Sequence, residues 1–157
     1  MKQEISAGII IYRKTKQGPK FLLLYHGGSY WNFAKGKVER EEQSMQTAFR
    51  EVREEAGFTR NELRLVGHFR EYEKFIFTKN KEKIFKIVTL YLAETRKTFV
   101  RISHEHDGYG WFTPNEAKII LKNYPNNLQV LKRAYEFLQH QGLENRTIHP
   151  KRQNTNL

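Results

Sequence analysis

One unbroken stretch of 23 residues, from Gly36 to Phe58, constrains this chain more than any other; it reads GKVEREEQSMQTAFREVREEAGF. Its glycines, one arginine and four of its glutamates follow the spacing Gly-x5-Glu-x7-Arg-Glu-Val-x-Glu-Glu-x-Gly-Phe. Within the stretch, apolar residues recur every three or four positions, which is the pattern of an amphipathic helix with one buried stripe. These residues are Met45, Ala48, Phe49, Val52 and Ala56. We therefore expect a helix over residues 42–56.

Three glutamates fall together on another side of this helix. At roughly 100° per residue, they are Glu51, Glu54 and Glu55. Like charges at these separations repel by a few tenths of a kcal/mol per pair, so a plain surface helix gains nothing by collecting them. A bound divalent cation would favour the cluster. Because the ligands are oxygen atoms, with no cysteine and no His-x3-His pair nearby, they suit Mg²⁺ or Mn²⁺ and not zinc.

The expected ion also predicts the kind of substrate. Such an ion keeps several waters and is usually bound through a few carboxylates together with substrate phosphates, so we expect a phosphorylated substrate. The framing glycines fit the same site. Gly57 suits a helix C-terminus because glycine tolerates the left-handed conformation, and Gly36 permits a tight loop and close backbone approach to the ion.

The stretch resembles the Nudix box, and the chain from about Gly8 to Leu138 resembles the Nudix hydrolases that cleave dinucleoside polyphosphates asymmetrically. The resemblance implies the Nudix fold, an α/β/α sandwich of the α+β type with a mixed central sheet, and Mg²⁺ or Mn²⁺ as cofactor. Arg50 is expected to orient the glutamates through a charge-assisted bidentate contact, and Glu42 to support the loop. The implied metal ligands are the carbonyl of Gly36 and the carboxylates of Glu51, Glu54, Glu55 and Glu105.

Two shorter phrases carry the resemblance beyond the box. Residues 30–36, Tyr-Trp-Asn-Phe-Ala-Lys-Gly, resemble a Trp-x-x-Pro-Lys-Gly approach in which the lysine contacts phosphate. Lys35 is thus a candidate phosphate ligand, and Ala34, in place of proline, is expected to loosen the loop. Residues 103–111 resemble the Ser-x-Glu-His-x-x-Tyr-x-Trp segment of dinucleoside tetraphosphate hydrolases. This makes Glu105 a metal ligand or the general base, a role for which Glu51 is the alternative.

Candidates for substrate binding lie on both sides of the box. His106 is placed to hydrogen-bond a phosphate or the attacking water, and Tyr109 to shape the nucleotide pocket. Relatives often carry Tyr followed by Trp or Phe before a Leu-Ala pair, where this chain has Leu90 and Tyr91. Two interpretations of this departure stay open: a base-stacking ring is missing, or Tyr91 contacts the substrate. The candidates for an aromatic clamp are Tyr30, Tyr72, Phe75 and Tyr109, and core packing is the alternative for any of these rings.

The charge of the chain is divided between the acidic box and basic surroundings. The net charge is +11, while residues 39–55 hold six glutamates and three arginines, a local −3 that leaves +14 elsewhere. Bound cations would neutralise the carboxylates, and the lysines would then attract a polyphosphate. The densest basic group is Lys74, Lys79, Lys81, Lys83 and Lys86. Two interpretations stay open: substrate contact, with Lys83 and Lys86 as candidates, and a charged edge that discourages strand pairing.

The remaining elements predict one domain over residues 1–141. We expect strands over residues 8–14 and 20–26, a hairpin of strands 63–77 and 84–94 with its turn at 78–83, and a short strand at 99–102. A helix should begin at Thr113, and another should cover residues 127–141. Residues 142–157 are polar, so we expect a disordered tail.

The predicted function is hydrolysis of nucleoside polyphosphates, with diadenosine tetraphosphate cut asymmetrically to ATP and AMP as first choice. Residues 31–37 also resemble the decapping phrase Trp-x-Phe-Pro-Lys-Gly-Lys, so an RNA 5′-end pyrophosphohydrolase is the enzymatic alternative. A nucleotide-binding regulator without turnover is the alternative of another class. The chain has no cysteine and shows no signal peptide or membrane span, so we expect a cytoplasmic protein. No obligate protein partner is evident.

Overall fold

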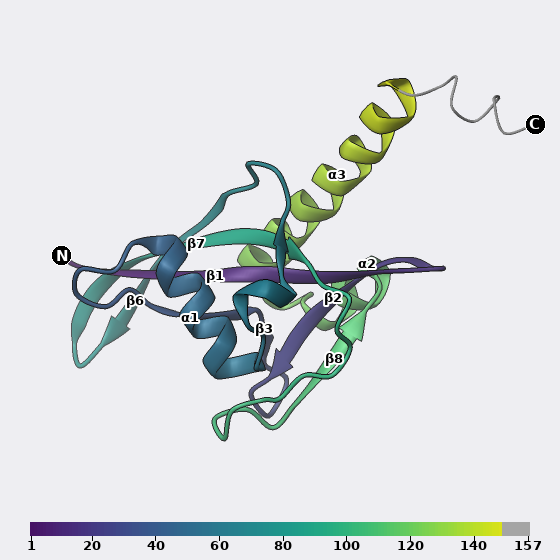
Figure 1. The fold of residues 1–157 in the computed structure, drawn as a ribbon. Coiled ribbons are helices and arrows are strands. Elements are labelled where there is room, and N and C mark those ends of the chain that lie inside the picture. The colour runs from purple at the N-terminus through teal and green to yellow at the C-terminus, as the bar shows by residue number, and fades with distance from the viewer. Residues whose placement is uncertain (149–157) are drawn as a thin grey trace, which may run out of the picture.

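The N-terminal strand β1 (Lys2–Thr15) is the centre of an eight-stranded mixed sheet in the computed structural model, which describes residues 1–148 (Figure 1). It runs parallel to β7 (Glu82–Glu94) along most of its length. On its other edge it pairs with β2 (Gly18–Tyr25) near its end and with β4 (Ala34–Lys37) near its beginning, both antiparallel. β1 begins six residues before the predicted strand at residue 8, because the parallel register with β7 starts at Lys2.

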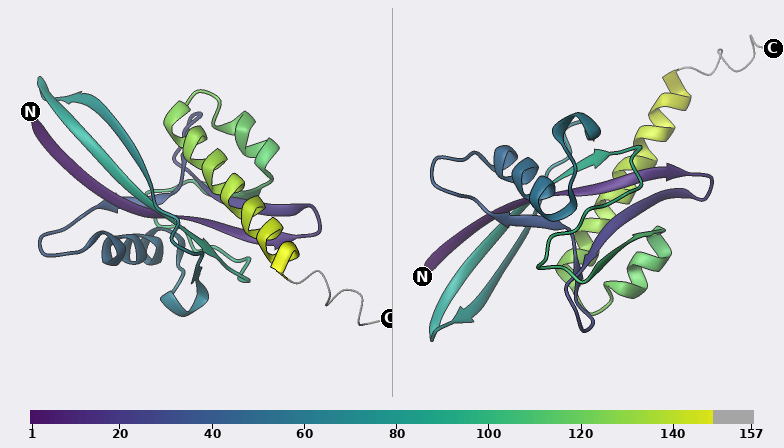
Figure 2. Two further views of the ribbon diagram at one scale, coloured as in Figure 1. Left: turned by 90° about the horizontal axis from the view of Figure 1, so that it is seen from above. Right: turned by 60° about the horizontal axis from the view of Figure 1, so that its bottom comes forward.

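The other strands extend this central group, and the helices cover it. The short strands are β3 (Trp31–Asn32), β5 (Arg64–Leu65) and β8 (Gly108–Phe112), and β6 (Glu71–Lys79) forms a hairpin with β7. The helices are α1 (Ser44–Ala56), α2 (Pro114–Ile120) and α3 (Pro125–Ile148), with a 3₁₀ turn at Arg60–Glu62. α1 and α3 lie on opposite sides of the sheet (Figure 2). The expected α/β/α sandwich with a mixed sheet is therefore confirmed.

Each face of the sheet has its own core, because successive strand residues point to opposite faces. The α1 face buries Ala7, Ile9, Ile11, Leu22, Leu24, Tyr91 and Ala93 against Ala48, Val52 and Ala56 of the helix. The α2–α3 face buries Ile10, Tyr12, Phe21, Leu23, Val88 and Leu90 against Ala117, Val130, Leu131 and Ala134. No helix among residues 1–148 is both long and apolar enough to cross a membrane.

The structure also differs from the expected hairpin of residues 63–94. The strand expected over residues 63–77 is two strands, β5 and β6, separated by residues 66–70. The hairpin turn is shorter than predicted: β6 continues to Lys79, and only Asn80 and Lys81 connect it to β7, both with positive φ (52° and 67°). A two-residue turn with positive φ at both positions matches the right-handed twist of the paired strands. The polar residues on either side of the turn can therefore pair as part of β6 and β7.

The segment expected as a strand at residues 99–102 is an extended loop. The N–H groups of Arg101 and Ser103 donate to the carbonyls of Ala56 and Glu55 at 3.1 and 3.2 Å. These are carbonyls at the C-terminal end of α1, where a helix leaves its acceptors without partners of its own. The N–H groups of this segment therefore donate to the end of a helix and not to a neighbouring strand.

Both predicted C-terminal helices are present. Thr113 caps α2, its hydroxyl accepting from the N–H of Glu116 at 3.2 Å. α3 begins at Pro125 and continues to Ile148, past the predicted end at Gln141. Residues 142–148 therefore belong to the helix and not to a disordered tail. Residues 149–157, for which a tail was also expected, lie outside the described residues.

Candidate active site

Helix α1 presents the glutamates as its sequence pattern predicts. Its stripe of Ala48, Val52 and Ala56 is fully buried. The helix begins after Gln43, whose N–H donates to the side chain of Gln46 at 2.8 Å, and ends at Gly57 in the left-handed conformation, with φ 75°. These signals fix both ends of the helix.

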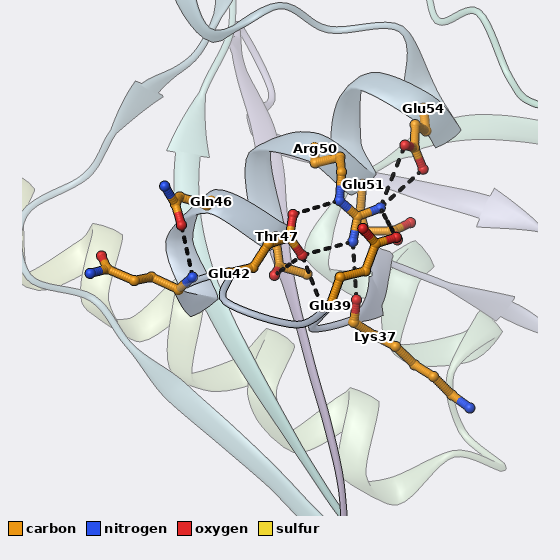
Figure 3. A network of polar contacts seen from close by, with 9 residues as sticks. Lys37, Glu39, Glu42, Gln46, Thr47, Arg50, Glu51 and Glu54 are labelled. Carbon is orange, nitrogen blue, oxygen red and sulfur yellow. Dashed lines mark hydrogen bonds and ion pairs between the residues drawn. The ribbon is translucent and has the colours of Figure 1, made fainter.

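Arg50 ties the carboxylates of this helix to the preceding loop (Figure 3). Its Nη1 lies 2.9 Å from Glu51 Oε1 and 3.3 Å from Glu54 Oε2. Its Nη2 donates to the carbonyl of Lys37 at 3.0 Å, and the guanidinium also binds Glu42. Arg50 therefore contacts three of the box glutamates and the backbone of β4 together.

The outer edge of β4 faces the glutamates. The N–H of Lys35 donates to Glu55 Oε1 at 2.9 Å. Gly36 lies directly against Glu51, and a Cβ added to Gly36 would overlap that carboxylate. Glycine is needed here for close approach of backbone and side chain. Ala34, for which a loosened loop was expected, is instead buried in β4 and paired with Ile9.

The electrostatics of Glu55 fit a cation site. Glu55 is 8% exposed, and burial raises the pKa of its carboxyl to about 8, opposed by the N–H of Lys35 and reinforced by the charges of Glu51 and Glu105. Burial likewise raises the pKa of Glu51, opposed by Arg50. Carboxylates crowded in this way are stabilised by a positive charge, so the donor set fits the hard divalent ion expected from the sequence.

The loop before β8 brings a second group of side chains to Glu55. His106 is 5% exposed, and its Nδ1 lies 2.8 Å from the hydroxyl of Ser103. Its Nε2 lies 2.9 Å from Glu55 Oε2, although without hydrogen-bond geometry. Burial lowers the pKa of His106. Glu105 is exposed beside it, close enough for its charge to act on Glu55.

Four rings form a row that the sequence did not predict, namely those of His106, His26, Tyr30 and Tyr124. The ring of His26 lies 4.4 Å from that of His106 and 4.8 Å from that of Tyr30, and Tyr124 follows at 5.3 Å from Tyr30. Tyr30 was predicted as a substrate contact, whereas His26 and Tyr124 were not. His26 directly follows β2. Its position as a polar ring at the end of a strand is the one feature of the sequence that could have identified it.

Some predicted substrate residues lie apart from this group. Lys35 and Lys86 project from the α2–α3 face, since Lys35 lies opposite Gly8 and Lys86 opposite Glu4. Lys83 lies on the other face of β7, because it is separated from Lys86 by an odd number of positions along the strand. Tyr91 is 6% exposed in the core beneath α1, so the structure gives it a packing position. Tyr109 is 37% exposed on β8, opposite Leu24.

The carboxylates are not gathered into a closed ligand set. Among the described residues, no three acidic or histidine side chains converge tightly enough to hold an ion. The side chain of Glu54 is 57% exposed and contacts Arg50, and Glu105 is exposed on the loop before β8. Two of the predicted ligands, Glu51 and Glu54, are joined through Arg50.

Comparison with known proteins identifies the family of this chain. The NUDIX domain family matches residues 2–134. A bis(5′-nucleosyl)-tetraphosphatase [asymmetrical] from Sus scrofa is 32% identical over 143 residues, which cover 85% of this chain and 94% of that protein. The enzyme of that name from Caenorhabditis elegans is 32% identical over 136 residues, or 85% and 95% of the two chains. The crystal structure of a C. elegans Ap4A hydrolase binary complex superimposes with a TM-score of 0.76 at 29% identity, covering 87% of this chain and 98% of that one. On this evidence the chain belongs to the NUDIX domain family.

Proposed function

We propose that this protein is a metal-dependent nucleoside polyphosphate pyrophosphohydrolase that cleaves diadenosine tetraphosphate asymmetrically to ATP and AMP. The observation that carries the proposal is the buried carboxylate of Glu55, held at the edge of β4 with Glu51 and Arg50 beside it. The similarity to asymmetrical tetraphosphatases over 85% of the chain supports the choice of substrate. The expected cytoplasmic location belongs to the same proposal.

The metal ligands in this proposal are the predicted ones. Mg²⁺ or Mn²⁺ would be held by Glu51, Glu54 and Glu55, with Glu105 at the rim and a backbone carbonyl of β4. The carbonyl of Gly36 was the expected backbone ligand. The carbonyl of the preceding residue, Lys35, is the alternative. Since the N–H and C=O of one strand residue point to the same edge, the Lys35 carbonyl shares the edge at which its N–H meets Glu55.

The chemistry requires an activated water and a neutralised phosphate chain. A bound divalent ion supplies both by lowering the pKa of its water and compensating developing charge. The chain's own residues orient the reactants: Arg50 fixes the glutamates, and Lys35 binds a phosphate. Glu51 or Glu105 accepts the proton of the attacking water, which requires hydrogen-bond reach of that water.

The surroundings of the site fit a nucleotide. Tyr30 and Tyr109 each keep 37% of their surface exposed and offer rings for stacking. His106 is buried beside Glu55, and burial lowers its pKa, so it would bind a phosphate as a neutral donor. Lys86 lies on the same face of the sheet as Lys35 and adds a second positive charge there.

One observation keeps the RNA alternative in view. The β6–β7 hairpin extends beyond the helices (Figure 2), and its tip carries Lys79, Lys81 and Lys83, all exposed. A basic projection of this kind suits the backbone of a nucleic acid. The same lysines also suit protection of an open strand edge.

The decisive experiment compares the products from diadenosine tetraphosphate and from a 5′-triphosphorylated RNA oligomer, each with Mg²⁺ and with chelator. Metal-dependent release of ATP and AMP, with slow turnover of RNA, supports the proposal. Faster turnover of RNA would favour the 5′-end hydrolase. Absence of turnover on both substrates and on other nucleotides, with binding retained, would favour a regulator without catalysis.

A further inference from the structure

A buried carboxylate without a partner lies on the α2–α3 face of the sheet, separate from the glutamates of α1. Glu73 of β6 is 3% exposed. Neither of its carboxylate oxygens has a hydrogen-bond partner among the described residues, and the same holds for the buried hydroxyl of Ser6. Buried carboxylates are ordinarily paired or hydrogen-bonded, so this group requires an explanation.

The strand register places two lysines on the face that carries Glu73. Glu73 lies opposite Val88 of β7, and Val88 lies opposite Ser6 of β1. Lys86 is two residues before Val88 and therefore points to the same face. Lys35 points there as well, because it lies opposite Gly8, two residues after Ser6.

Gly8 gives the side chain of Lys35 its position over the sheet. A Cβ on Gly8 would overlap both the carbonyl of Ala34 and the Cβ of Lys35, so only glycine leaves that position open. Within the described part of the chain, neither Lys35 nor Lys86 makes an ion pair or hydrogen bond with Glu73. The carboxylate and the two lysines thus belong to the same face of the sheet without pairing with one another.

The charges of these groups influence one another. Burial raises the pKa of Glu73, opposed first by Lys35 and then by Lys86. Burial lowers the pKa of Lys35, opposed first by Glu73. Burial also raises the pKa of Tyr30, and the charge of Glu73 adds to that effect. Tyr30, Lys35 and Glu73 are therefore close enough for the charge of Glu73 to act on both of the others.

This region begins at the carboxylate site of α1. The backbone of Lys35 contacts Glu55, whereas its side chain lies on the sheet face toward Glu73. Three strand spacings, about 14 Å in total, separate β4 from β6, and the two side chains shorten that gap. A polyphosphate at the α1 glutamates would meet Lys35 first, and the nucleoside attached to it would extend toward Glu73.

We propose that Glu73 recognises the nucleoside of the substrate, its carboxylate accepting hydrogen bonds from N–H or O–H donors while Lys35 and Lys86 bind the adjoining phosphates. This inference rests on the proposed function. An ionised carboxylate only accepts hydrogen bonds, so it repels phosphate and selects donors. A nucleoside offers two sources of donors: the ribose hydroxyls, which carboxylates bind in dinucleotide folds, and the amino or imino groups of the base.

The competing role for Glu73 is purely internal, as the counter-charge that holds Lys35 in place. The two roles predict different responses to ligands. A residue that only holds Lys35 affects every ligand that uses Lys35, with or without a nucleoside. A residue that recognises the nucleoside affects nucleotides and leaves inorganic polyphosphate unaffected.

The test is isothermal titration calorimetry in chelator, with AMP, ADP and inorganic tripolyphosphate as ligands of the full chain. For Glu73→Gln we expect nucleotide binding to weaken by about tenfold or more, while tripolyphosphate binds equally or more tightly because a negative charge is gone. Glu82→Gln, at the exposed start of β7, should match the unchanged protein. Lys35→Ala should weaken all three ligands.

Equal weakening of nucleotides and tripolyphosphate in Glu73→Gln, or no change in either, would overturn the proposal. If Glu73→Gln does not fold, Glu73→Asp serves in its place, since it keeps the charge and withdraws the carboxylate. Comparing AMP with its 2′-deoxy form and with IMP then separates the ribose from the base as the donor. Binding requires no turnover, so loss of hydrolysis in the product analysis with nucleotide selectivity intact would remove the proposed function and leave Glu73 in place.

Discussion

Arg50 holds Glu42 through both carboxylate oxygens: Nε donates to Oε2 at 2.7 Å and Nη2 donates to Oε1 at 3.0 Å. Glu42 also accepts from the hydroxyl of Thr47 at 2.7 Å and from the N–H of Glu39 at 3.0 Å. These contacts, led by Arg50, lower the pKa of Glu42 to about 2. The loop before α1 is thereby fastened to the helix that carries the glutamates.

Arg50→Lys should destabilise the protein, because an ammonium cannot reproduce the planar fork that binds Glu42, Glu51 and Lys37 at once. We expect the free energy of unfolding to fall by about 1–3 kcal/mol, measured by urea denaturation, together with a loss of turnover. Arg53→Lys, on the exposed side of the same helix, is the matched control. Equal stability in the two variants would contradict the orienting role.

Glu54→Gln should abolish most of the activity and leave the fold intact. The side chain of Glu54 is 57% exposed and contacts Arg50 at 3.3 Å, so its charge contributes little to stability. As a metal ligand it is expected to lower turnover by orders of magnitude when changed. Turnover is measured alongside Glu136→Gln, an exposed substitution on α3, and activity at the level of that control would remove Glu54 from the mechanism.

Gly36→Ala should damage the site through sterics alone, because the new Cβ would overlap the Glu51 carboxylate. We expect turnover or metal affinity to fall by about tenfold or more. Gly142→Ala offers the reverse case: nothing lies within 4 Å of a Cβ there, and the position is inside α3. That change should stabilise the protein by about 0.5–1 kcal/mol. A Gly36→Ala protein with normal turnover would disprove the close approach.

The stability of the metal-free protein should fall as pH rises from about 4.5 to about 8. Burial raises the pKa of Glu55 from 4.5 to about 8, so over this interval the folded state keeps a proton that the unfolded state releases. The contribution falls by at most about 1.4 kcal/mol per pH unit. Denaturation in chelator should show the slope, and Glu55→Gln should flatten it. Identical slopes in the two proteins would contradict the raised pKa.

Lys35→Ala should reduce activity less than the glutamate substitutions, with the larger loss on substrates with longer phosphate chains. The reason is that one phosphate contact is removed while the metal ligands remain. Lys118→Ala provides the control, since that lysine is exposed on α2. Turnover of tri- and tetraphosphate substrates compares the variants. Equal losses on short and long chains would count against Lys35 as a phosphate ligand.

The sequence predicted the features that local spacing determines. The buried stripe, the ends of α1 and the positions of Glu51, Glu54 and Glu55 follow from helical periodicity and from one glycine that suits the left-handed conformation. Thr113 as a cap followed from the Pro and Glu after it. In each case the relevant partners are separated by four residues or fewer.

Features that depend on distant pairing were not predictable in this way. The loop at residues 99–102 has strand-like composition, but its N–H groups bind the end of a helix more than forty residues earlier. Tyr91 and Lys83 were candidates by residue type, and only the register of β7 with β1 and β6 shows which face they occupy. Glu73 was not predicted, because no local pattern marks a carboxylate that will be buried without a partner.

The two hydrogen bonds from Arg101 and Ser103 to the end of α1 divide the connection between β7 and β8 into parts with different tolerance for redesign. An insertion ahead of Arg101 lengthens the loop after β7 and leaves both hydrogen bonds to α1 in place. An insertion between Arg101 and Ser103 displaces Glu105 and His106 from Glu55. Loop grafts from relatives with other substrates should therefore keep residues 101–106 and exchange only the residues ahead of Arg101.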